Sequence, residues 1–481
     1  MKSSKLKKLC AVIMAATIST TLFIGCGSSN DGSTSIKGNS NASDTVKQEL
    51  VFNLGADPET IDPTINTASE ASTVILNAFE CIMTLDENDN AVEGAAESVE
   101  VSDDGLVYTI KLRKDGKWSD GEPVVADNFK YSWVRALTKE NAAEYAYQLY
   151  YIKNAEKYYN GEATADEVGI KVVDDYTLEV KTTVRVSFFD ELMAFPCFFP
   201  INEKFCEKQG DKYGKSAKAI LGNGAFIMTN WEPGSIAEFK KNEDYYEAKT
   251  VKIEKLVMKL VQDPKVAAQS FMAGETDYAP ITSDLVDKYK DDESFKQVPD
   301  GFLYYLSVNF QNEDLANANI RQAVSLSINR KDLCEKVLKD GSSAATGFIP
   351  KGVATSPDGK DFREESGTYI TYSQSKAQQA LDRGLKELGK SEIKLRITYG
   401  TDESPMDVIA TYLQNSLSKL KGIKIEMVAT TKQDRIYNKQ KNGDYDLSVT
   451  RWGPDYGDPT TFLTIDISTN SNNSVSYTHL T

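Results

Sequence analysis

The chain has 481 residues, with 71 acidic and 55 basic side chains and a net charge of −16. A chain of this length normally folds around more than one core, so we expect two or three lobes. Its 40% hydrophobic and 26% charged residues are ordinary for a soluble globular protein. The negative charge disfavours nucleic acid and anionic membrane surfaces as partners, because both would repel the protein.

The first 25 residues have the layout of a secretory signal. Four lysines at positions 2–8 precede an apolar stretch from Leu9 to Ile24, which is short and interrupted by hydroxyl side chains. These features favour a cleaved signal over a permanent membrane span.

The end of this stretch, Phe23-Ile24-Gly25-Cys26, resembles a bacterial lipoprotein signal, although leucine is commoner at the Phe23 position. The resemblance implies a lipid anchor on the Cys26 thiol. It would hold the protein on the outer face of the cell membrane, or in the periplasmic space if the cell has an outer membrane. An ordinary signal peptide with an incidental cysteine is the alternative. Residues 26–48 are rich in Gly, Ser, Asn and Asp, so we expect a flexible tether there.

The first half of the body alternates predicted strands and helices. Hydrophobic periodicity predicts a strand over Leu50–Leu54, a helix over Ala71–Met83 and a strand over Val107–Leu112. Asp127 is expected to cap a helix that buries Phe129, Trp133 and Leu137. Two hairpins follow, with strands at Ile170–Val173, Thr177–Lys181, Ala225–Trp231 and Ile236–Lys240.

The second half continues this mixed α/β pattern. Helices are predicted at about 264–273, 319–328, 373–388 and 404–420, and strands at 303–310, 393–399, 423–428 and 445–452. The sequence has no repeat of fixed period, which argues against a solenoid or a propeller. We assign Trp118 and Trp133 to the core.

Catalysis finds little support in this sequence. The only histidine is His479, so the body lacks Ser-His-Asp and Cys-His machinery and histidine ligands for a metal. Nucleotide-binding loops and the nucleophile elbow are also absent from the sequence. Paired carboxylates, as in a glycosidase, stay open as an alternative. We therefore predict a protein that is not an enzyme and holds no cofactor and no metal.

The cysteines after Cys26 do not have the spacing of a metal site or a disulfide scaffold. Cys197 and Cys206 would pair only if the fold brings them together. Buried free thiols are the expected state.

Several segments in order between about residues 50 and 465 resemble the oligopeptide- and dipeptide-binding proteins of bacterial ABC importers. The longest runs from Tyr108 to Val124 (YTIKLRKDGKWSDGEPV). The others lie at 57–63 (DPETIDP), 69–80, 221–226 (LGNGAF), 242–246 (NEDYY), 319–330 and 444–459 (DYDLSVTRWGPDYGDP).

The resemblance implies an α/β, two-lobed, periplasmic-binding-protein-like fold of class II, with an additional inserted domain and a hinge between the lobes. Domain I would comprise residues 49–79 and 221–301, domain II residues 80–220, and domain III residues 302–481. Family members continue past this point and return to domain I. The last residues, 470–481, depart from the family pattern, so we expect a truncated or wrongly joined C-terminus.

The resemblance also implies a ligand site between the lobes. A short peptide with a free N-terminus would lie extended and pair with the main chain of 66–68, including Asn66 and Ala68, and of 451–453, including Arg451. Its ammonium would meet Asp455, the hydroxyl of Tyr145 and the carbonyl of Gly453. Trp452 would line a side-chain pocket, and Tyr304 and Tyr305 would lie on the strand between the lobes. The expected partners are such peptides and the permease subunits of an ABC importer, and the expected state is a monomer.

Each assignment has a simpler alternative. Asp455 lies in a D-Y-G-D-P stretch, where aspartates commonly cap turns. Tyr145 belongs to a tyrosine-rich run that could be core, and Trp452 could equally be core. Asn223-Gly224 is expected to form a turn at a domain crossing rather than a ligand contact. The same receptor class also includes proteins for nickel chelates, haem and oligosaccharides, and a secreted glycan-active enzyme or adhesin is a further alternative.

Overall fold

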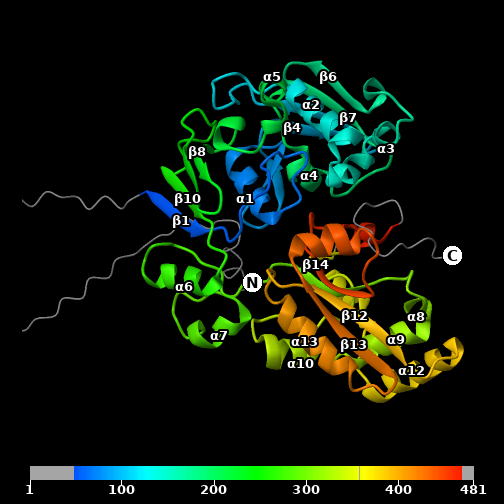
Figure 1. Ribbon diagram of the computed structural model, residues 1–481. Helices are drawn as coiled ribbons and strands as arrows, with labels where there is room; N and C mark the ends of the chain where they lie inside the picture. Colours follow the sequence, from blue (N-terminus) through cyan, green and yellow to red (C-terminus); the bar gives the residue numbers. More distant parts are fainter. Residues whose placement is uncertain (1–47, 357, 468–481) are drawn as a thin grey trace, which may run out of the picture.

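The chain folds into two lobes that face each other across a gap in the ribbon (Figure 1). The computed structural model describes residues 48–356 and 358–467. The expected signal, Cys26, most of the tether and residues 468–481 lie outside this range. None of the helices in the described part is both long enough and apolar enough to cross a membrane.

The upper lobe contains two four-stranded sheets. The first has the order β1 (Glu49–Asn53), β10 (Lys255–Lys259), β9 (Ile236–Lys241) and β8 (Phe226–Glu232), with β1 parallel to β10 and the other pairs antiparallel. Helices α1 (Ser69–Ala78), α6 (Pro264–Met272) and α7 (Ser283–Tyr289) belong to the same part of the chain. This sheet therefore joins segments that lie about 200 residues apart in the sequence.

The second upper sheet is antiparallel throughout. Its order is β4 (Ala96–Val101), β5 (Val107–Leu112), β7 (Thr177–Lys181) and β6 (Ile170–Asp174), and β2 (Met83–Leu85) pairs with β3 (Ala91–Glu93) beside it. The helices here are α2 (Ala126–Leu137), α3 (Ala155–Tyr159), α4 (Phe189–Leu192) and α5 (Glu203–Gln209), with a 3₁₀ helix at Glu144–Tyr151. Trp118 and Trp133 are fully buried, which confirms their assignment to the core.

The lower lobe holds one mixed sheet, in the order β11 (Leu303–Val308), β14 (Leu447–Trp452), β12 (Ile393–Gly400) and β13 (Ile423–Thr430). Its helices are α8 (Glu313–Ala316), α9 (Ala318–Ser327), α10 (Arg330–Asp332), α11 (Phe362–Ser366), α12 (Gln374–Leu388), α13 (Met406–Leu417) and α14 (Thr460–Leu463). Two π-helical segments, Leu333–Leu338 and Asp434–Gln440, complete it.

One edge of β14 is open where the strand leaves the sheet. β11 pairs with β14 along its whole length, from Leu303–Trp452 to Val308–Leu447. On the other side, β12 pairs only with Leu447 and Ser448. Residues 449–452 therefore have no strand neighbour on that side among the described residues, so an extended chain could be added there.

Two local predictions were wrong. The helix predicted over Ala71–Met83 ends at Ala78, and Met83 begins a strand. Phe79 is extended, and the Asn223 side chain accepts a hydrogen bond from the Glu80 N–H and donates to the Glu80 carbonyl just past the helix. This contact joins Asn223 to the segment after α1, at a crossing of two chain segments within the upper lobe.

The second error is the cap at Asp127, which lies inside the first turn of α2. The residue that caps the helix is Val125, and its N–H donates to Asn128 Oδ1 at 2.9 Å. Asn128 also accepts from the indole N–H of Trp118 at 3.1 Å. A local contact between Val125 and Asn128 therefore takes the capping role that we expected of Asp127.

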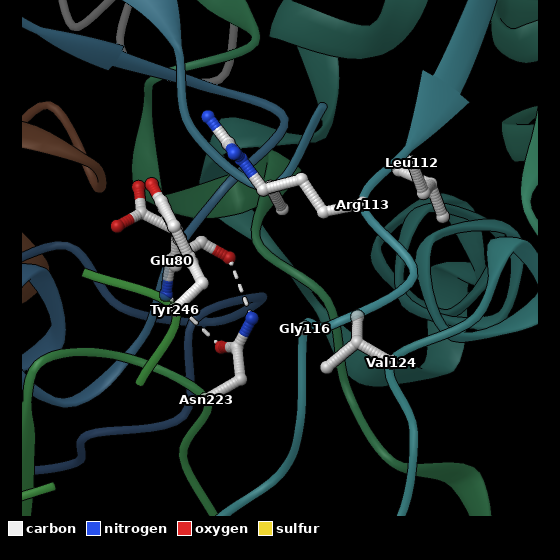
Figure 2. Close-up of a pocket in the computed structure, with 8 residues that line it drawn as sticks. Glu80, Leu112, Arg113, Gly116, Val124, Asn223 and Tyr246 are labelled. Atoms are coloured by element: carbon white, nitrogen blue, oxygen red, sulfur yellow. Dashed lines mark hydrogen bonds between the residues drawn. The ribbon is translucent and has the colours of Figure 1, made fainter. Parts of the chain in front are cut away.

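The crossing encloses a small cavity of about 10 Å³, which is enough for one water molecule (Figure 2). Its lining includes Glu80, Arg113 and Tyr246, and the Arg113 guanidinium lies 4.3 Å from the Tyr246 ring centroid. Glu80 accepts a hydrogen bond from the Tyr245 hydroxyl at 2.5 Å. Burial nevertheless raises the pKa of Glu80 to about 7.

We expect Glu80→Gln to stabilise the protein more at pH 8 than at pH 5. Glu80 keeps its proton up to about pH 7 in the folded chain, whereas it ionises near pH 4.5 when unfolded. The free energy of unfolding therefore falls as pH rises between these values, by about 3 kcal/mol, and glutamine removes this loss. Urea unfolding of both proteins at the two pH values measures it. An equal difference at pH 5 and pH 8 would contradict the assignment.

Candidate ligand-binding site

A carboxylate of the lower lobe lies against a polar helix of the upper lobe. Asp455 follows β14, and its N–H donates to Thr461 Oγ1 at 2.9 Å. Its carboxylate accepts from Gln148 Nε2 at 3.0 Å and from the hydroxyls of Tyr145 and Tyr147. These three residues come from the 3₁₀ helix Glu144–Tyr151. The structure thus brings Asp455 and Tyr145 together, as the resemblance implies.

The carboxylate of Asp455 is uncompensated by any basic side chain among residues 48–356 and 358–467. Within the part of the chain that the structure describes, no lysine or arginine forms an ion pair with it. Burial raises the pKa of Asp455 to about 8, and the hydrogen bonds from Tyr145, Tyr147 and Gln148 offset only part of that effect. An acid held neutral in this way would regain its charge if a cation bound beside it.

The two tyrosines act as fixed donors. Burial first, and then the nearby Asp455 carboxylate, raise the pKa of Tyr145 and Tyr147 well above the usual value. Both hydroxyls therefore keep their protons. Their rings are stacked, with centroids 5.9 Å apart, and the Tyr145 ring also packs on Phe195.

Arg451 and Gly453 lie beside the open edge of β14. The Arg451 guanidinium lies 4.5 Å from the Phe302 ring centroid, and its Nη1 donates to the Tyr304 hydroxyl at 3.3 Å. A Cβ on Gly453 would lie only 2.8 Å from the Phe302 ring, so any larger residue here would have to displace that ring.

Trp452 points to the other face of the sheet. It packs half-buried beside Leu303 and Phe462, and its indole N–H donates to the Thr461 carbonyl at 2.9 Å. Tyr305 is on the same face, and its ring lies 5.4 Å from Phe348. The structure thus gives Trp452 and Tyr305 core contacts in this small cluster.

The upper-lobe segment at 66–68 lies just before α1, and its polar groups are largely used within the chain. Asn66 Nδ2 donates to Ser72 Oγ at 2.8 Å, and Asn66 Oδ1 accepts from the Ala68 N–H at 2.9 Å. The Ala68 carbonyl accepts from the Ser72 N–H. A ligand strand would therefore have to use the remaining main-chain groups of 66–68.

Direct contacts join the two lobes next to Asp455. The rings of Phe188 and Tyr456 are stacked, with centroids 4.5 Å apart and planes 6° from parallel. The Gly457 N–H donates to the Glu191 carboxylate. Farther along, Lys441 Nζ lies 2.6 Å from Glu144 Oε1. The lobes are therefore closed on each other.

The chain matches the model of the bacterial extracellular solute-binding proteins, family 5, over residues 90–474. It belongs to this family. Family 5 proteins bind solutes, so the prediction of a binding protein rather than an enzyme is confirmed.

This family 5 protein is 30% identical to the oligopeptide-binding protein OppA of Bacillus subtilis, over 97% of this chain and 86% of that one. It superposes on Listeria monocytogenes OppA bound to peptide with a TM-score of 0.83, at 33% identity and over 90% and 86% of the two chains. These matches confirm the predicted two-lobed class II periplasmic-binding-protein fold.

A third relative bears on the closed arrangement. The family 5 protein superposes on the Escherichia coli murein tripeptide-binding protein MppA with a TM-score of 0.80 and on the unliganded open form of MppA with 0.62. Identities are 26% and 27%, and both alignments cover 90% of this chain, with 85% and 84% of the other chains. The lobes here are therefore not arranged as in that open form.

Several residues at this site of the family 5 protein were not predicted from the sequence. Tyr147 and Gln148 were missed, although a three-residue period in the 3₁₀ helix puts Tyr145 and Gln148 on one face. Phe188 and Glu191 were also missed, and no sequence signal points to them because their partners belong to the other lobe. The described residues contain no cluster of side chains that could hold a metal ion.

Proposed function

We propose that this protein captures short peptides with a free N-terminus and delivers them to the membrane permease of an ABC importer. One observation carries the proposal: a carboxylate without a basic partner, Asp455, lies between closed lobes at the end of a strand with an open edge. A carboxylate in this setting favours a cationic group on an extended ligand. Two relatives from Bacillus subtilis, the oligopeptide-binding protein OppA and the dipeptide-binding protein DppE, support the same ligand class.

The ligand would be held by its main chain and its positive end. Its ammonium would bind Asp455, with the Tyr145 hydroxyl and the Gly453 carbonyl as further acceptors. Its backbone would pair with the open edge at 451–453, and with the remaining groups of 66–68 from the upper lobe.

The protein side chains beside the bound peptide would shape the pockets for the peptide's side chains. The part of Trp452 that is not packed against Leu303 and Phe462 would line one pocket, while Tyr304 and Tyr305 would support the neighbouring strand. Arg451 would contribute main-chain groups. Main-chain pairing accepts many side chains, so the proposal implies broad peptide selectivity.

The proposal extends to the membrane anchor and the domains of the protein. Residues 1–25 would be a lipoprotein signal, and a lipid on Cys26 would tether the protein through residues 26–48 outside the cell membrane. Domain I would comprise 49–79 and 221–301, domain II 80–220 and domain III the chain from 302. We expect a monomer that binds the permease only transiently.

Calorimetric titration of the mature protein tests the ligand class. We expect free peptides of two to five residues to bind, and oligosaccharides, nickel chelates and haem not to bind. Tight binding of an uncharged sugar, with no response to any peptide, would replace this function with the sugar-receptor alternative.

A further inference from the structure

The buried amide of Gln148 has an oxygen with no partner. Gln148 is 1% exposed, and its Nε2 donates to the Asp455 carboxylate and, at 3.4 Å, to the Tyr147 hydroxyl. Its Oε1 is buried, and it accepts no hydrogen bond from the described residues. A buried acceptor without a donor costs about 1–3 kcal/mol, so a site that keeps one gains when a ligand supplies the donor.

The oxygen belongs to the amide group that hydrogen-bonds the Asp455 carboxylate. Gln148 Nε2 donates to the Asp455 carboxylate at 3.0 Å. Oε1 and Nε2 are bonded to the same carbon atom of the Gln148 side chain. The hydroxyls of Tyr145 and Tyr147 both donate to Asp455 and are oriented by it. Gln148 Oε1 is the neighbouring side-chain oxygen that has nothing to accept.

We propose that Gln148 Oε1 accepts a hydrogen bond from the ligand's ammonium beside Asp455, and so makes the site select primary ammonium groups over N-substituted ones. This inference rests on the proposed function and deepens it. A primary ammonium offers three N–H donors. Gln148 is a fourth acceptor beside Asp455, Tyr145 and Gly453, so one N–H would be shared between two acceptors. An N-methyl group replaces one donor with a carbon that no acceptor can use.

The test compares alanine peptides of two to five residues, each as the free, N-methylated and N-acetylated form. We expect the wild-type protein to bind the free form about tenfold more tightly than the N-methylated form, and the acetylated form most weakly. Gln148→Met keeps the length of the side chain but has no acceptor oxygen. Its preference for the free form over the N-methylated form should fall close to one.

A second variant separates the two atoms of the amide. Gln148→Glu keeps an acceptor oxygen and loses the N–H donor, so it should retain the preference for primary ammonium. Gln374→Met is the matched control, because both amide atoms of Gln374 are also buried and unpartnered, in α12. This control should leave the preference unchanged.

The outcomes are distinct. If Gln148→Met keeps the wild-type ratio between free and N-methylated peptides, with or without a general loss of affinity, Gln148 is only structural and the inference is wrong. Loss of the ratio in Gln148→Glu would also overturn it. If no peptide form binds the wild-type protein, the proposed function itself fails, and the wild-type titration alone shows this.

Discussion

Asp455→Asn should lose most of the difference in affinity between free and N-acetylated peptides. Losing one partner of a buried charge pair typically costs about 2–5 kcal/mol, which is roughly a 30-fold to several-thousand-fold drop in affinity for the free peptide. The acetylated peptide has no positive charge, so its weak affinity should change little. Calorimetric titration of both peptides measures the ratio.

The empty Asp455→Asn protein should remain folded. The Asp455 carboxyl is neutral up to about pH 8 in the closed structure, and asparagine has nearly the same shape as the neutral acid. Asp458→Asn is the control from the same stretch, because Asp458 Oδ1 accepts from the N–H and hydroxyl of Thr460 within its own loop. Equal affinity of the wild-type protein for free and acetylated peptides would contradict the role of Asp455.

Binding of a free peptide at pH 7 should also release about one proton. Asp455 holds its proton below about pH 8 in the empty closed site and ionises beside a cation. Affinity should therefore fall as pH drops below 8. Titration in buffers of different ionisation enthalpy measures the proton, and Asp455→Asn should abolish its release.

Phe188→Leu should speed the dissociation of bound peptide, with little effect on its association. The stacked pair of Phe188 and Tyr456 joins the lobes, and such pairs add about 0.5–1.5 kcal/mol beyond their buried area. Losing it should make dissociation about two- to tenfold faster, because interface changes act mainly on the dissociation rate. Stopped-flow displacement of a fluorescent peptide measures this rate.

The neighbouring residue offers a matched control. Phe189 is also buried, but its ring packs on Tyr108 and Phe198 within the upper lobe. Phe189→Leu should lower thermal stability and leave peptide dissociation unchanged. If both variants speed dissociation equally, the effect comes from general destabilisation and not from closure.

Much of the fold was predictable because its signals are local. Strands β5 and β7 begin and end where the alternation of apolar residues predicts, at Val107–Leu112 and Thr177–Lys181. The errors arose at helix ends, where side-chain hydrogen bonds override the apolar pattern. Asn223 holds Glu80, just past α1, from more than 140 positions away, and Asn128 rather than Asp127 pairs with the capping residue of α2.

The site was predictable only in part for a related reason. Asp455 and Tyr145 follow from family motifs, and the structure brings them together. The role inferred for Gln148 depends on which amide atom is left without a partner, and that of Phe188 depends on how the lobes meet. Neither property is visible in the order of residues along the chain.

The three consecutive residues Asp455, Tyr456 and Gly457 imply that ligand binding and closure of the lobes are coupled. The first carries the acid, the second stacks on Phe188, and the third bonds to Glu191. Burial favours the protonated form of Asp455, so closure without a ligand becomes less favourable as pH rises. A ligand with a positively charged group stabilises the ionised Asp455 and so favours closure. The permease would then mainly encounter the ligand-bound protein.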